Sequence, residues 1–344
     1  MAVGDQAKAG VQSFVAFRQE STYGTDAVTT TALQVCEPIS IGFKTEFETK
    51  KLPSLNKNRA AVKQVQLAKN VMGNLETYLH PEESLHFLIN AMGGNYTFTS
   101  LTAAGSHSIS TGNFASTDTI TSLSLHARKG DTHNFRYLGG VINSLKISAK
   151  TGEEARVSAE FVFQNSTIGS ADLAGALSIS TVAPFTYVNG TYRYDATEGS
   201  LTSSVAESIM SFELEIKNNL VTDDKNRALG SQLISGRPPA LNREVMLKIT
   251  QRFDTTTTYD RMVQNTQGAV ALFFSGTSIS AEYSRQMNII LPNVRHRNTE
   301  PTVGGSDEVL TSEIEFDCIL SGNAGTSTSR EIGMTIINTV LSKL

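Results

Sequence analysis

The seven residues from His80 to His86 contain the densest group of potential metal ligands in this 344-residue chain. His80 lies just before a predicted helix, and Glu83 and His86 are three residues apart, so they could share one face of that helix. A zinc site needs a fourth ligand, which this segment does not supply. The acidic residues are explained equally well by the positive end of the helix dipole. We therefore predict no metal site.

Two pairs of carboxylates, Glu213 with Glu215 and Glu313 with Glu315, have the spacing of neighbours on one face of a strand. General acid–base catalysis needs a carboxyl held in apolar surroundings with a raised pKa, but both pairs lie on the polar side of their strands. The sequence contains no glycine-rich phosphate loop, nucleophile elbow or HExxH motif. Cys36 and Cys318 are expected to be small buried residues. The sequence predicts neither an enzyme nor a cofactor.

The composition favours strands joined by turns over long charged helices. Charged residues make up 18% of the chain, and 29 basic against 33 acidic residues give a formal net charge of −4. Such a balance gives no general attraction to nucleic acid or to anionic membranes. The N-terminal residues do not resemble a secretory signal, and no apolar run approaches the roughly 20 residues that cross a bilayer. We expect synthesis in a cytosol and no membrane partner.

Alternation of apolar and polar residues is the dominant pattern, and it predicts strands with one buried face. The alternating apolar sets are Ile39/Ile41/Phe43, Leu145/Ile147/Ala149, Val157/Ala159/Phe161/Phe163, Phe212/Leu214/Ile216, Val245/Leu247/Ile249 and Ile314/Phe316/Cys318/Leu320. Two helices are predicted, one over Pro81–Met92 and one that follows Thr258 and ends at Gly268. The expected fold class is mainly β (α+β).

Both helices lie in the same order of elements, which indicates that one domain is used twice. In each half a strand leads into a polar loop, a return strand, a helix and a further strand. The predicted loops are Lys50–Gln64 and Asn219–Asn242. The expected organisation is an N-terminal arm (1–38), a first β-sandwich or barrel domain (39–165), a connector (166–208), a second such domain (209–320) and a C-terminal tail (321–344). Within the connector, Asn189-Gly190 predicts a type I′ hairpin turn.

Three short stretches resemble the major tail tube proteins of long-tailed, non-contractile bacteriophages. They are Phe17–Thr25 (FRQESTYGT), Gly73–Glu76 (GNLE) before the proline-started helix, and Ser211–Asn219 (SFELEIKNN). The resemblance extends from about residue 12 to residue 320. It implies a small β-sandwich with one flanking helix in each domain, and a location in the phage tail.

The resemblance also implies self-assembly into stacked rings around a channel for DNA, with tail tip, baseplate and terminator proteins as further partners. Related tubes place six equivalent domains around the channel, so a duplicated chain predicts trimeric, pseudo-hexameric rings. The alternative is a true hexamer in which the second half decorates the outside. A different class, a β-sandwich module that binds glycans or receptors, also fits a chain without enzyme motifs. The absence of tryptophan disfavours it, because carbohydrate platforms use aromatic faces.

Two sets of residues are predicted to carry the function. Those opposite the apolar strand faces would line the channel, and they comprise six acids and two bases: Lys146, Glu160, Glu213, Glu215, Lys248, Glu313, Glu315 and Asp317. We therefore expect an acidic to neutral channel wall, because each basic contact with phosphate would slow DNA. The charged residues of the two long loops would contact the next ring: Lys50, Lys51, Lys57, Arg59, Lys63, Asp223, Asp224, Lys225, Arg227 and Arg237.

Overall fold

A computed structural model shows that the chain is mostly antiparallel β-sheet. It describes residues 13–29, 33–52, 63–111, 120–130, 133–169, 180–299, 301–302, 309–322 and 329–343. Lys57 and Arg59 lie outside the described residues. The fold is mainly β, as the sequence predicts.

Within the described residues, the first half of the chain contains eleven strands and helix α1. These are β1 (Phe14–Gln19), β2 (Gln34–Cys36), β3 (Pro38–Ile41), β4 (Lys44–Leu52), β5 (Lys63–Tyr78), α1 (Leu85–Met92), β6 (Asn95–Ser100), β7 (Gly105–Ser110), β8 (Leu123–Lys129), β9 (His133–Lys150), β10 (Arg156–Phe163) and β11 (Asn165–Gly169).

In the part of the second half that the structure describes there are nine strands, helix α2 and three short 3-10 helices, η3 to η5. These are η3 (Tyr187–Asn189), β12 (Gly190–Asp195), η4 (Glu198–Ser200), β13 (Ala206–Glu207), β14 (Ser211–Lys217), η5 (Asp224–Asn226), β15 (Glu244–Arg252), α2 (Thr257–Val263), β16 (Gln267–Ser278), β17 (Ser284–Asn298), β18 (Pro301–Thr302), β19 (Thr311–Cys318) and β20 (Gly333–Asn338).

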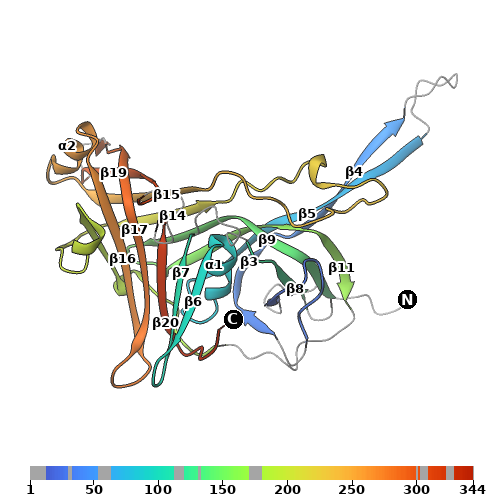
Figure 1. Cartoon of the computed structure of the whole chain (residues 1–344), viewed down its shortest axis with the longest axis horizontal. Helices are drawn as coiled ribbons and strands as arrows, with labels where there is room; N and C mark the ends of the chain where they lie inside the picture. The colour runs from blue at the N-terminus through green and yellow to red at the C-terminus, as the bar shows by residue number, and fades with distance from the viewer. Residues whose placement is uncertain are drawn as a thin grey trace, which may run out of the picture.

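One run of hydrogen-bonded strands connects both halves in the order β4-β5-β10-β9-β14-β15-β19-β17-β20-β7-β6. Strands β1, β8 and β11 extend the N-terminal part of β9, and β12 and β16 extend β17. Helix α1 lies on one side of the sheet formed by β9, β14 and β15, while β4 and β5 project from the body as a long ribbon (Figure 1).

The predicted alternation holds in the central strands. Phe212, Leu214 and Ile216 of β14 are buried, whereas Glu213 between them is exposed. The main core cluster takes residues from both sides of 166–208, including Leu88 of α1 and Leu247 of β15. The two-domain division proposed from the sequence stays a prediction. The prediction that Ile39 belongs to a buried strand face was wrong, because its side chain is exposed on the short strand β3.

Strand β9 takes part in two regions of the sheet because it changes direction at Gly139. Its residues before Gly139 pair with β8 and β11, and those after Gly140 pair with β10 and β14. Gly139 has φ of +66°, and a Cβ there would lie 2.8 Å from Cβ of Gln164. Glycine therefore permits both the backbone angle and the close packing at the bend.

Three local predictions from the sequence need correction. Helix α1 begins at Leu85, not Pro81, because the preceding residues form turns in which the His80 N–H donates to Ser84 Oγ. Helix α2 ends at Val263, and Gly268 lies inside β16. The left-handed residue after α2 is Asn265, with φ of +49°.

The Asn189-Gly190 pair does not form the predicted type I′ hairpin. Asn189 belongs to η3, and Gly190 begins β12 with φ of −89°. The side chain of Asn189 accepts hydrogen bonds from the Thr186 N–H and hydroxyl at 2.8 and 2.9 Å, and it donates to the Ser275 carbonyl. These contacts stabilise a 3-10 turn instead, and β12 pairs with β16 and β13.

Candidate assembly surfaces

All eight residues predicted to line a channel lie on one face of five adjacent strands, β10, β9, β14, β15 and β19. Cross-strand register brings them together, because Lys146 pairs with Glu215, Glu213 with Lys248, and Lys248 with Glu315. Partners directly opposite in a sheet point to the same side. We call this surface the charged face. The side chains that alternate with these residues fill the core on the other side of the sheet.

Ion pairs run across the strands of the charged face. Lys146 Nζ lies 3.0 Å from Glu213 Oε1 and 3.7 Å from Glu215 Oε1, and Lys248 Nζ lies 2.8 Å from Glu313 Oε2. The Glu213 and Glu313 carboxylates raise the pKa values of Lys146 and Lys248, respectively. Exposed pairs of this kind contribute at most about 1 kcal/mol each to folding. Their main effect is to hold each ammonium group beside a carboxylate.

Further basic residues on this face were missed from the sequence, among them Lys150, which pairs with Ser211 of β14, and Arg252, which pairs with Thr311 of β19. Lys217 Nζ lies 3.2 Å from Glu215 Oε2, and an Arg297 guanidinium nitrogen lies 3.7 Å from Asp317 Oδ1. Lys217 could have been found, because it lies two residues after Glu215 on the same strand. Arg297 could not, since only the register of β17 against β19 places it there. The face is therefore less acidic than the six acids and two bases that the sequence indicated.

A shallow groove on the charged face is lined by β14, β15, β17 and β19. Its charged lining residues are four acids and two bases: Glu213, Glu215, Lys248, Arg297, Glu315 and Asp317. Both predicted carboxylate pairs contribute to this lining or lie beside it. None of these carboxyl groups lies in apolar surroundings, so the arrangement resembles a charged wall more than a catalytic site.

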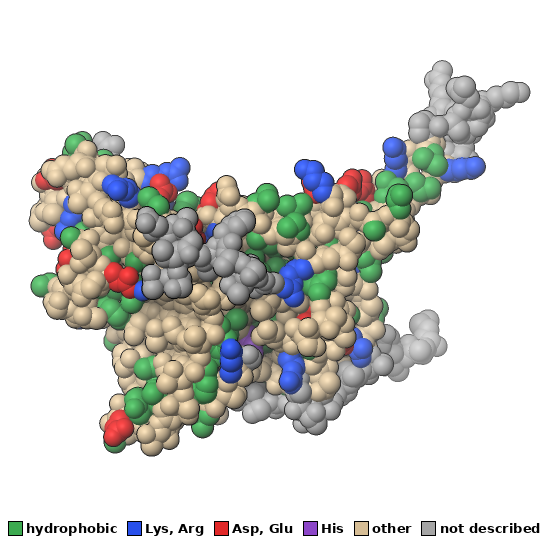
Figure 2. Space-filling view, viewed as in Figure 1, with side chains coloured by type: hydrophobic (Ala, Val, Ile, Leu, Met, Phe, Trp, Pro, Cys, Tyr) green, Lys and Arg blue, Asp and Glu red, His purple; other side chains and the backbone are tan. Residues whose placement is uncertain are grey.

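The first predicted loop is largely a two-stranded ribbon. Lys50 and Lys51 lie in β4, and Lys63 and Gln64 lie in β5, so the expectation of a loop over Lys50–Gln64 is corrected for these residues. All nine residues of β4 are exposed. Lysine and apolar side chains are mixed on this projection (Figure 2). We call the part formed by residues 44–52 and 63–70 the arm.

The second predicted loop, between β14 and β15, lies against the base of the arm. One Arg227 guanidinium nitrogen donates to Asn70 Oδ1 at 2.5 Å and another to the Gln232 carbonyl at 2.6 Å. The Lys69 N–H donates to the same carbonyl at 2.9 Å. Arg227 therefore holds the second loop against β5 through hydrogen bonds within the chain. The other charged residues predicted in this loop do not form one cluster. Asp223 and Asp224 lie beside Lys225 at η5, whereas Arg237 lies elsewhere, near Tyr23.

The stretch Phe17–Thr25 forms a structural clamp around the carboxylate of Glu20. This buried group accepts hydrogen bonds from the Gly24 N–H at 2.8 Å, Ser122 Oγ at 2.7 Å, Ser124 Oγ at 2.8 Å and the Gly139 N–H at 2.7 Å. Four donors compensate the loss of hydration of a buried carboxylate. The clamp joins β1 to β8 and to the bend in β9.

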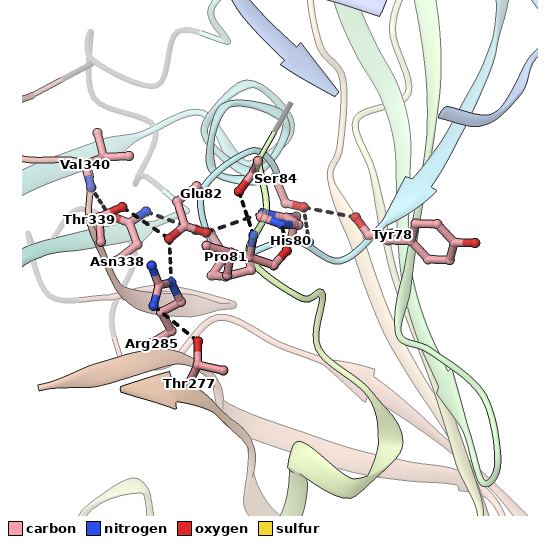
Figure 3. A network of polar contacts seen from close by, with 12 residues as sticks. Tyr78, His80, Pro81, Glu82, Ser84, Thr277, Arg285, Asn338, Thr339 and Val340 are labelled. Carbon is pink, nitrogen blue, oxygen red and sulfur yellow. Dashed lines mark hydrogen bonds and ion pairs between the residues drawn. The ribbon is translucent and has the colours of Figure 1, made fainter. Parts of the chain in front are cut away.

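The His80–His86 segment forms a second polar junction (Figure 3). Glu82 Oε1 accepts from Arg285 Nε at 2.6 Å and from Thr339 Oγ1 at 3.3 Å, and Glu82 Oε2 lies 3.4 Å from His80 Nδ1. His80 Nε2 lies 2.5 Å from the Val182 carbonyl. This junction joins the start of α1 to β17 and to the segment after β20.

Electrostatics in the junction agree with that arrangement. Burial alone would lower the pKa of His80, but the Glu82 and Glu83 carboxylates and the Val182 carbonyl outweigh it and raise the pKa. Burial likewise opposes ionisation of Glu82, yet His80 and Arg285 hold its pKa below the usual value. His86 lies on α1, and its ring packs edge-on against Phe17. Across the residues that the structure describes, no cluster of three or more His, Cys, Asp or Glu side chains is placed to hold a metal ion.

These features define a mainly β protein with an exposed charged face and a projecting two-stranded arm. The sequence profile described as phage tail tube protein matches residues 10–318, and the chain belongs to this family. No curated protein matches the chain. The protein is therefore a structural subunit of the tube in a phage tail, where it assembles with itself and with other tail components. Neither of the helices in the described ranges has the length and apolar character needed to span a bilayer.

Proposed function

We propose that the subunits form stacked rings around a channel through which viral DNA passes, and that the charged face lines this channel. The observation that carries the proposal is the position of this face: it covers five contiguous strands on the opposite side of the sheet from α1. Neighbouring subunits could continue such a sheet around a ring. Tail tip, baseplate and terminator proteins would contact the two ends of the tube. No catalytic activity is part of this proposal.

The ion pairs suit a wall along which DNA must slide. A free lysine or arginine would bind phosphate and release counterions, which gives adhesion that depends on salt. Lys146, Lys217, Lys248 and Arg297 each lie within 4 Å of a carboxylate oxygen instead. Nearby carboxylates compete with phosphate for these cations and repel the polyanion. The wall would then neither bind DNA tightly nor recognise its sequence.

Charge reversal on this face tests the proposal. Phage that carry Glu213→Lys and Glu313→Lys should form tubes of normal length but eject DNA more slowly at low salt, with recovery as salt rises. Glu153→Lys with Glu282→Lys makes the same change in net charge at exposed positions outside the face and serves as the control. A tube reconstruction with Glu213 and Glu313 on the outer surface would contradict the proposal.

The ring would contain three chains if each half supplies one tube domain. The shared order of elements around α1 and α2 supports this count, because three chains would then place six similar domains around the channel. True sixfold rings with the second half outside are the alternative. Image reconstruction of tubes without imposed symmetry decides between them, since six identical chains per ring would contradict the trimer.

The arm is the proposed contact to the next ring. Its lysines Lys50, Lys51 and Lys63 are exposed, whereas Arg227 in the second loop is tethered to β5. We therefore expect the charged residues of the first predicted loop, rather than those of the second, to make most of the contacts between stacked rings. Replacement of Lys51, Lys57 and Arg59 by glutamate should leave isolated rings that do not elongate, as seen by negative-stain electron microscopy. Tubes of normal length from this variant would contradict the arm's role.

A further inference from the structure

Three of the four exposed large apolar residues of the arm lie on one of its two faces. Lys50 pairs with Val65, Leu52 with Lys63, and Phe47 with Lys69, and the register shifts between Phe47 and Thr49. From Phe47 to Thr49 strand β4 advances two residues while β5 advances three, so the bulge lies in β5 and β4 keeps its alternation. Leu52 therefore points to the same side as Val65 and Leu67 of β5, and Phe47 points to the other side. The three clustered side chains are exposed, and Leu67 is 43% exposed. Lys50 and Lys63 share their face.

Such a ribbon is marginally stable in water unless something covers it. The arm projects beyond the body of the subunit, and the second loop touches only its base through Gln232 and Arg227. A face with three apolar side chains and lysines has the composition of a contact surface. Its partner should offer apolar side chains flanked by acids.

Helix α2 leaves part of its apolar surface in solvent, because the residues that face the protein are Thr258, Arg261 and Met262. The Arg261 guanidinium lies 4.1 Å from the centre of the Tyr194 ring and 3.8 Å from Glu207, and Gln251 Nε2 donates to Thr258 Oγ1 at 3.3 Å. Tyr259 and Val263, one turn apart, point outward, and Val263 is 64% exposed. A helix that leaves its apolar pair in solvent indicates a missing partner.

More exposed apolar surface lies where the chain enters α2. The Phe253 N–H donates to the Leu310 carbonyl at 3.0 Å, and both Leu310 and Val309 are exposed. Asp254 and Asp260 are exposed in the same region. We call the surface formed by residues 253–263 and 309–310 the α2 end. It lies at the opposite end of the molecule's long axis from the arm (Figure 1).

We infer that the α2 end of one subunit receives the apolar face of the arm from a second copy of the chain. Apolar residues meet apolar residues, and Lys50 and Lys63 approach Asp254 and Asp260. Because the two surfaces lie at opposite ends, the contact is head to tail, and such a contact can repeat from one ring to the next along a tube. The inference rests on the proposed function and adds to it the surface that receives the arm.

Two variants separate the two halves of this contact. Leu52→Asp with Leu67→Asp removes the apolar face of the arm, and Tyr259→Asp with Val263→Asp removes the apolar pair of the α2 end. All four side chains are exposed, so both proteins should fold, with unchanged circular dichroism and unfolding midpoints. Each variant alone should give rings but at least tenfold fewer tubes. Val188→Asp, an equally exposed apolar residue in η3, should elongate normally.

A mixture of the two variants gives the sharper result. The intact arms of an α2-end-variant ring can dock on the intact α2 ends of an arm-variant ring. The two-ring product then exposes only the altered arms at one end and the altered α2 ends at the other, so no further ring can bind. The mixture should therefore stop at stacks of two rings, which sedimentation velocity and electron microscopy resolve. Normal tubes from the α2-end variant alone, or from the mixture, would overturn the inference.

Photo-crosslinking identifies the receiving surface directly. Benzoylphenylalanine at position 67 in assembled tubes should crosslink to peptides that contain residues 253–263 or 309–310, as read by mass spectrometry. Crosslinks between chains at any other surface would overturn this assignment while leaving arm-mediated stacking intact. A wild-type chain that forms neither rings nor tubes would instead overturn the proposed function, and the inference with it.

Discussion

Helices α1 and α2 occupy equivalent places in the chain but opposite environments. Each follows a long strand, β5 or β15, and leads into the next strand, β6 or β16. All eight residues of α1 are buried, whereas none of α2 is. The order of elements therefore predicts where a helix forms, but the side chains decide how deep it lies. Leu85, Phe87 and Leu88 make α1 part of the core, and Thr257, Asp260 and Arg261 keep α2 at the surface.

The largest expected difference between the helices comes from deletion of an aromatic ring. Phe87 is fully buried, and its ring centre lies 4.8 Å from that of Phe17. Phe87→Ala should lower the free energy of unfolding by about 3–5 kcal/mol through lost burial and a residual cavity. Tyr259→Ala in α2 should change it by about 0.5 kcal/mol or less. Urea unfolding followed by circular dichroism measures both, and similar losses would show that the two helices are equally buried.

The next largest difference between the helices is expected in how the free energy of unfolding depends on pH. Burial, with smaller contributions from His107 and Arg18, lowers the pKa of His86 in α1 to about 4. The unfolded chain, with an ordinary value near 6.5, then binds the extra proton between about pH 6.5 and 4, so stability falls as pH falls through this window. His86→Leu should make the loss of unfolding free energy between about pH 6.5 and 4 smaller by up to about 3 kcal/mol. Urea midpoints between pH 4 and 7 test this.

His80 provides the matched control for that experiment. Its raised pKa means that its contribution is present below about pH 6.5 and is lost as pH rises through the folded-state value. His80→Leu should therefore reduce stability mainly on the acid side, which is the opposite sign. Identical pH profiles for the two leucine variants would show that the opposite environments of these histidines do not matter.

A smaller effect is expected from the polar residue inside α1. Asn90 Oδ1 accepts from the Ile142 N–H at 2.9 Å, and Nδ2 donates to the Thr121 carbonyl at 2.7 Å. Asn90→Ala leaves these buried backbone groups without their partner and should cost about 1–3 kcal/mol. Gln264→Ala, at the exposed end of α2, should be nearly neutral. Thermal unfolding of both variants sharpens the comparison, and a neutral Asn90→Ala would contradict the role of this side chain.

The smallest effect should come from Arg261, which attaches α2 to the protein. Arg261→Ala removes the contact with Tyr194 and the ion pair with Glu207, and together these should be worth about 1 kcal/mol. Hydrogen exchange should show faster opening of residues 257–263 without a change in α1. Global destabilisation as large as that of Phe87→Ala would mean that α2 is part of the core.

Patterns that depend on a buried face could be predicted from the sequence. Phe212, Leu214 and Ile216 alternate because one side of β14 meets the core, and the same alternation places Glu213 and Glu215 on the charged face. The extent of β4 and β5 could not be predicted in this way. No residue of β4 is buried, so its sequence lacks the alternation that a core imposes and resembles a loop.

Contacts between distant residues account for the other differences. The sequence around Glu20 does not reveal that Ser122 and Ser124 donate to its carboxylate. Likewise, Asn189-Gly190 is a strong local turn signal, but the bonds of Asn189 to Thr186 and Ser275 favour another conformation. Local propensity predicts an element only where no side chain makes a better bond elsewhere.

The position of β20 has a consequence for the order of events during synthesis. This strand lies between β17 and β7, and Met334 pairs with Ile109 in the first half of the chain. A ribosome delivers β7 long before its partner, so the β6–β7 hairpin keeps an open edge until residues 333–338 emerge. Pairings of such high contact order form slowly, and open edges invite aggregation. Nascent chains are thus most vulnerable to mispairing just before β20 closes the sheet.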